Sequence, residues 1–162
     1  MSLRRRFAAA SLLLALATCA QARSFEGVVT HVTDGDSLWV RPASGGAPRQ
    51  IRLQGIDAPE ICQAFGVASR NALAAHVLHR RVAVASRARD GYQRVLGRVS
   101  VNGEDLGAWL VSRGLAWSDR YRHRPGPYEP QEARARAARL GLWADGTPLL
   151  PREFRKRHGR CK

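Results

Sequence analysis

The chain has 162 residues, of which 44% are hydrophobic and 25% are charged. This length and apolar content suit a single globular domain with a sizeable core and argue against two domains or a repeat array. The 27 lysines and arginines outnumber the 13 acidic residues, which gives a formal net charge of +14. Such an excess favours polyanionic partners, either nucleic acid or an anionic surface.

The first 22 residues have the pattern of a secretory signal peptide. A basic start, "MSLRRRF", precedes the apolar run "AAASLLLALAT" and the small-residue motif "AQA". We expect cleavage after Ala22, a single mature domain over 23–162, and a periplasmic or secreted protein. About a dozen apolar residues are too few for the roughly 20 that span a bilayer, so no stable membrane span is expected in the mature chain. Lipid attachment at Cys19 is the alternative left open.

Export would leave two of the three cysteines, Cys62 and Cys161, in a compartment where disulfides persist. We hypothesise a bridge between them that ties the C-terminal tail to the segment after residue 60. Two unpaired thiols are the alternative.

The elements predicted in chain order describe a mainly β protein with helical additions. Alternating residues with a turn at Asp34-Gly35 predict a hairpin, and the helical segment after Gly66 carries Val67, Leu73 and Val77 as its apolar positions. The elements are a hairpin over 25–42, strands over 49–56, 81–86 and 95–101, and helices over 66–80, 104–113 and 130–140. Five strands and about three helices favour a small Greek-key barrel of the OB-fold type.

Four carboxylates lie between residues 34 and 60 of this basic chain: Asp34, Asp36, Asp57 and Glu60. Carboxylates at turns of neighbouring strands can converge on a hard cation such as calcium, which prefers several oxygen ligands. Taken alone, "DGD" at 34–36 is also typical of an ordinary β-turn. Arg52 and Arg94 would form a phosphate clamp beside the carboxylates, although each taken singly could be an ordinary surface arginine.

Four motifs occur in one order: "VTDGDSLWV", "IRLQGIDAPE", "DGYQRVLGRV" and "EARARAARLGLW". In this order they resemble the staphylococcal-nuclease-like (thermonuclease) family, over roughly residues 25–155. The resemblance implies an OB-fold nuclease that uses Ca²⁺ to hydrolyse phosphodiester bonds of DNA and RNA. It implies cleavage of the P–O5′ bond, which leaves 3′-phosphate ends.

The resemblance also implies roles for individual residues. Asp36, Asp57 and the Ala58 backbone carbonyl would bind calcium, and Ala58 replaces a threonine of the family pattern. Glu60 would be the general base, while Arg52 and Arg94 would contact the scissile phosphate and stabilise the charge that develops there. Tyr92 would bind substrate, and so would a second tyrosine in the loop after residue 117, for which Tyr121 and Tyr128 are the two alternatives.

A second hypothesis is an OB-fold module that binds nucleic acid without cleaving it. The complete set of three acidic and two basic site residues favours the enzyme, because a binding module has little need for all five. The basic run at 154–158, "FRKRH", is interpreted as a solvated charge run or as a tail that binds polyanions. A monomer is the default expectation.

Overall fold

The computed structural model describes residues 23–120, 124–159 and 161. Within them, the strands are β1 (Arg23–Asp34), β2 (Ser37–Pro42), β3 (Arg49–Leu53), β4 (Ile56–Asp57), β5 (Arg81–Arg89), β6 (Val95–Val101), β7 (Glu104–Asp105) and β8 (Trp117–Ser118). The helices are α1 (Gly66–Val77), α2 (Leu106–Ser112), α3 (Glu129–Ala137) and α4 (Pro151–His158), with a 3-10 turn η1 (Gly141–Trp143). The predicted mainly β class with helical additions is confirmed.

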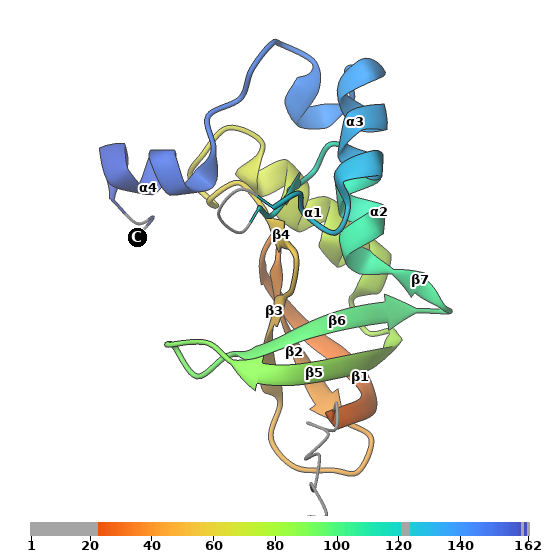
Figure 1. Ribbon diagram of the computed structural model, residues 1–162. Coiled ribbons are helices and arrows are strands. Elements are labelled where there is room, and N and C mark those ends of the chain that lie inside the picture. Colours follow the sequence, from red (N-terminus) through yellow and green to blue (C-terminus); the bar gives the residue numbers. More distant parts are fainter. Residues whose placement is uncertain (1–22, 121–123, 160, 162) are drawn as a thin grey trace, which may run out of the picture.

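Five strands close into a barrel, seen in the lower half of Figure 1. They pair in the order β3-β2-β1-β5-β6, and the parallel pairing of β3 with β6 completes the closure. The 12-residue β1 pairs with β2 along its second half and with β5 along its first half. Two register irregularities in β1 fit this double pairing, because bulges increase the local bend and twist of a strand. The predicted OB-fold barrel is therefore confirmed.

Aliphatic side chains from every barrel strand fill the interior. The side chains that are at most 2% exposed include Val29, Leu38, Val40, Ile51, Leu53, Val82, Val84, Val99 and Val101. Most strands alternate between buried and accessible positions, as a two-residue period requires. Polar residues are thereby placed outside the barrel, where the site is built.

Helix α1 covers one end of the barrel and contacts β1. Its buried positions are Gly66, Ser69, Leu73 and Val77, whereas Val67 is 50% exposed. The expectation that Val67 contributes to the apolar face is therefore wrong. The helix begins with Gly66 close to the preceding loop, and the inward stripe continues from Gly66 in successive steps of three, four and four residues.

The third helix is shorter than predicted, because α3 ends at Ala137 rather than near Leu140. Arg139 has φ +52°, and the Leu140 N–H donates to the Ala135 carbonyl at 3.0 Å. A left-handed residue closing such a bond is the usual way a helix ends, and glycine is its usual occupant. Because arginine stands where glycine is usual, the sequence carries no signal that the helix ends here.

The C-terminal segment forms a fourth helix where a solvated charge run was one interpretation. Helix α4 stands to one side of the molecule in Figure 1 and leads to Cys161. The predicted disulfide between Cys62 and Cys161 is present, and it joins residues 99 positions apart. None of the helices in the described part of the chain has the length and apolarity needed to cross a membrane.

Candidate active site

Arg52 projects from β3 on the face opposite the barrel interior, since both of its neighbours on the strand are buried. Its guanidinium lies between two carboxylates: Nη1 is 2.7 Å from Asp36 Oδ2, and Nη2 is 2.9 Å from Asp57 Oδ1. Nη1 also donates to the carbonyl oxygens of Leu53 and Ile56, at 3.3 and 3.1 Å. The planar group is thus held in one orientation by the β1–β2 turn, the end of β3 and the short strand β4.

Asp36 connects the β1–β2 turn to the loop after β4. Its N–H donates to Asp34 Oδ1 at 3.0 Å, a local bond typical of aspartate in turns. Its Oδ2 accepts from the Ala58 N–H at 2.8 Å, and its Oδ1 accepts from Ser37 Oγ at 3.1 Å. Asp36 is only 6% exposed. The "DGD" stretch is therefore a β-turn that also delivers a buried carboxylate to the site.

Residues 58–60 form a corner between β4 and α1, and Glu60 is its last residue. The Glu60 side chain is 23% exposed and forms an ion pair with Arg155 of α4, with 2.5 Å between Oε1 and Nη1. A Cβ on Gly66 would lie 1.9 Å from the Glu60 carbonyl oxygen. Helix α1 can approach the corner this closely only because its first residue is glycine.

Arg94 lies at the end of the β5–β6 turn, which Asp90 organises. Asp90 Oδ1 accepts from the backbone N–H groups of Tyr92 and Arg94, and Oδ2 accepts from Arg94 Nε at 2.7 Å. Gln93 supplies the positive φ of this turn, +64°. Arg94 Nη1 reaches Ser37 Oγ at 3.3 Å, one residue from Asp36. Ser37, the first residue of β2, therefore links Arg94 to the Asp36 carboxylate, because its hydroxyl contacts both.

These segments line one open groove with a volume of about 600 Å³. Its lining residues are Thr33, Asp34, Gln50, Arg52, Glu60, Ile61, Tyr92, Arg94, Arg155 and Cys161. Two guanidinium groups predicted to hold phosphate and the predicted general base share this groove. Asp36 and Asp57 do not line it, but both are ion-paired with Arg52, which does.

Comparison with known protein families identifies the fold's relatives. The family described as "Staphylococcal nuclease homologue" matches residues 50–145, which is more than half of the chain. The chain belongs to this family. The resemblance drawn from the sequence motifs is confirmed, and membership assigns the chain to the nuclease class of hydrolases.

Three known proteins are similar to the chain over most of their length. An uncharacterized endonuclease of Haemophilus influenzae is 35% identical over 94% of this chain and 86% of its own. The protein ParB of Escherichia coli is 38% identical over 93% of this chain and 90% of its own. A micrococcal nuclease of Shigella flexneri is 35% identical over 93% of this chain and 91% of its own.

At the centre of this nuclease-family site, two carboxylates, Asp36 and Asp57, pair with the single guanidinium of Arg52. Burial raises the pKa of Asp36 to about 7, with Arg52 opposing the increase and Asp34 and Asp57 adding to it. Burial also raises the pKa of Asp57, against the lowering effects of Arg52 and Arg155. One guanidinium is thus shared by two poorly solvated carboxylates, and the site favours a further positive charge.

The structure brings together five of the predicted residues: Asp36, Arg52, Asp57, Glu60 and Arg94. Tyr92 lies at the rim of the groove, 63% exposed, with its ring 5.5 Å from the Arg94 guanidinium carbon. Tyr121, Cys19 and the cleavage site after Ala22 lie outside the described residues. In the part of the chain that is described, no three histidine, cysteine, aspartate or glutamate side chains converge as a metal cluster.

Sequence reasoning missed three residues that shape the site. Arg155 contacts the Glu60 and Asp57 carboxylates, Asp90 holds Arg94, and Gln63 contacts the Glu60 backbone. Asp90 could have been found, because an aspartate four residues before an arginine across a glycine-containing turn is a local pairing pattern. Arg155 lies 95 residues from Glu60 and has no such local signal.

Proposed function

We propose that the protein is a calcium-dependent nuclease that hydrolyses phosphodiester bonds of DNA and RNA and leaves 3′-phosphate ends. The observation that supports this most directly is the shared groove, in which Arg52, Arg94 and Glu60 face one volume beside the Asp36 and Asp57 carboxylates. Family membership and the net charge of +14 agree with a nucleic acid substrate.

The residues around Asp36 fit a hard divalent cation by their chemistry. The proposed ligands are the carboxylates of Asp36 and Asp57 and the carbonyl of Ala58, and all of them are oxygens, as calcium prefers. The two carboxylates are poorly solvated and share one guanidinium, so added positive charge would stabilise their ionised forms. When bound, the ion would stabilise the negative charge that develops on the phosphate oxygens.

The two arginines would bind the phosphate and stabilise the transition state. The contacts that Arg52 makes with described residues use its Nη1 and one proton of its Nη2. The Nε–H of Arg52 can therefore donate to a phosphate oxygen. Arg94, which lines the same groove, would donate to the same phosphate. As the water oxygen bonds to phosphorus, negative charge grows on the non-bridging oxygens, and fixed guanidinium groups stabilise that charge.

Glu60 would act as the general base. It lines the groove and is partly exposed, so a water molecule can reach its carboxylate. The water would give one proton to Glu60, its oxygen would bond to phosphorus, and the P–O5′ bond would break. The O5′ atom then takes up a proton, and the phosphate stays on the 3′ oxygen.

We also propose that the protein is exported to the periplasm or secreted as a monomer. The basic, apolar and small-residue pattern of residues 1–22 supports export. The Cys62–Cys161 disulfide supports it independently, because disulfides persist in oxidising compartments and are rare in the cytosol.

A degradation assay tests the proposed activity. The purified protein should degrade single-stranded DNA and RNA in the presence of calcium and stop when EDTA is added. Digests should carry phosphate at their 3′ ends. Binding of nucleic acid without cleavage would support the non-catalytic module instead, and equal degradation in EDTA would exclude metal dependence.

The affinity for calcium should depend on pH. A pKa of about 7 means that Asp36 is largely protonated below pH 7 in the metal-free protein, and its proton must leave before the carboxylate binds calcium. One such proton predicts a dissociation constant about tenfold higher at pH 6 than at pH 8, with little change above pH 8. Titration calorimetry at pH 6, 7 and 8 measures this, and an affinity that is constant over the range would contradict it.

A further inference from the structure

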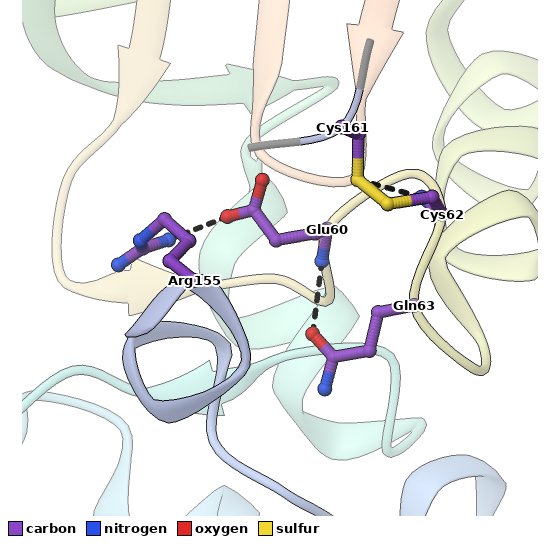
Figure 2. Close-up of a disulfide and its surroundings, with 5 residues drawn as sticks. All are labelled: Glu60, Cys62, Gln63, Arg155 and Cys161. Carbon is purple, nitrogen blue, oxygen red and sulfur yellow. Dashed lines mark hydrogen bonds and ion pairs between the residues drawn. A yellow bond between two sulfur atoms is a disulfide. The ribbon is translucent and has the colours of Figure 1, made fainter. Parts of the chain in front are cut away.

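Helix α4 is fastened at both ends to two consecutive residues beside the active-site corner. Before the helix, Gln63 Nε2 donates to the Leu149 carbonyl oxygen at 2.6 Å. After the helix, Cys161 is bonded to Cys62. The same Gln63 side chain accepts from the Glu60 N–H through Oε1, at 3.2 Å (Figure 2). The C-terminal segment is thus attached to the corner that carries the proposed base.

Arg155 projects from α4 between these two attachments and points toward Glu60 (Figure 2). Its Nη1 binds Glu60 Oε1, and its Nη2 lies 3.7 Å from Asp57 Oδ2. Among the described residues, Arg155 is the one whose side chain donates to the Glu60 carboxylate. Arg155 lies beyond residues 50–145, the segment that matches the family, so the matched segment does not account for this contact.

We propose that Arg155 is a positioning residue for Glu60 and that the Cys62–Cys161 disulfide holds it in place. This inference rests on the proposed nuclease function of the same site. A glutamate side chain has three rotatable torsions, and a partly exposed one samples several rotamers. The planar guanidinium holds Oε1 and so restricts the rotamers of Glu60 beside the groove, while its Nη2 lies near the Asp57 carboxylate.

Steady-state kinetics of three variants test the role of Arg155. Arg155→Gln should lower kcat about 10- to 100-fold while KM changes less than about threefold, because a misplaced base slows the chemical step and leaves phosphate contacts intact. Arg155→Lys keeps one charged donor and should recover part of the loss. The matched control is Arg157→Gln, which removes the same charge from an exposed position of α4 and should retain the wild-type kcat.

The role of the disulfide is tested by combining its removal with the Arg155 substitution. The double variant Cys62→Ser/Cys161→Ser should lower kcat to a similar extent as Arg155→Gln. Adding Arg155→Gln to this double variant should then lower kcat by less than about a further twofold, because the effects of substitutions that disrupt one shared interaction are not additive. Thermal unfolding of each variant verifies that the protein is folded at the assay temperature.

Four outcomes would overturn the inference. They are a kcat for Arg155→Gln equal to that of Arg157→Gln, a faster Arg155→Gln enzyme, a loss confined to KM, and independent, multiplicative losses from the arginine and the cysteines. In each of these cases the wild-type enzyme is active, so the proposed nuclease function stands. An inactive wild-type protein would overturn that function and this inference together.

Discussion

Replacing Glu60 by glutamine is expected to lower the rate of phosphodiester hydrolysis by about 10²- to 10⁴-fold, the usual contribution of a general base. Glutamine keeps an oxygen that can accept from Arg155 Nη1, so the corner and α4 should stay in place. What it loses is the ability to take a proton from water. The expected change is therefore in kcat, with substrate affinity nearly unchanged.

Single-turnover cleavage of a short labelled oligonucleotide measures this effect, with the dissociation constant determined separately in EDTA. Glu129→Gln is the matched control, because Glu129 is exposed at the start of α3 and does not line the groove. A Glu60→Gln enzyme that retains the wild-type rate would remove Glu60 from the role of base. A large loss of affinity would instead assign it to substrate binding.

Replacing Arg52 by methionine should abolish measurable activity and also destabilise the fold by about 3–5 kcal/mol at pH 8 in the absence of calcium. Removing one partner of a buried ion pair leaves uncompensated charge behind, and here two carboxylates and two backbone carbonyls lose the same donor. The group is well shielded, since the Arg52 and Asp36 side chains are 18% and 8% exposed.

The destabilisation should shrink as the pH falls from 8 to 5. Arg52 opposes the effect of burial on the pKa of Asp36. Without it, the folded-state pKa of Asp36 lies further above the unfolded value than in the wild type, so the variant gains more stability than the wild type as pH decreases. Urea unfolding followed by tryptophan fluorescence at both pH values measures the effect. The exposed Arg41→Met change on β2 should alter stability by no more than about 0.5 kcal/mol. An equal loss at pH 5 and pH 8 would contradict the electrostatic explanation.

Local patterns predicted the barrel and the centre of the site. Ile51 and Leu53 alternate around Arg52, so the strand period alone places the arginine outside the core, next to the turn that carries Asp36. The corner at residues 58–60 ends β4, and it places Glu60 in the lining of the groove, whereas Asp57 at the end of β4 binds Arg52. These residues are close in sequence to the features that orient them.

Features set by distant contacts could not be predicted. The orientation of α1 depends on the contact of Gly66 with the Glu60 backbone, and this turned Val67 outward. The position of α4 depends on Cys62 and Gln63, which lie nearly a hundred residues earlier. A short run of basic residues has the composition of a solvated surface, and only the tertiary fold brings Arg155 to Glu60.

We expect catalysis to require an ion held by Asp36 and Asp57 beside Glu60. The most direct test is one calcium titration of the purified protein, read as heat of binding and as nuclease rate in parallel samples. Both signals should saturate over the same calcium range, and Asp36→Asn should shift both to higher calcium concentration together. Full activity before the site is occupied, or an Asp36→Asn variant that binds calcium and cleaves as the wild type does, would contradict it.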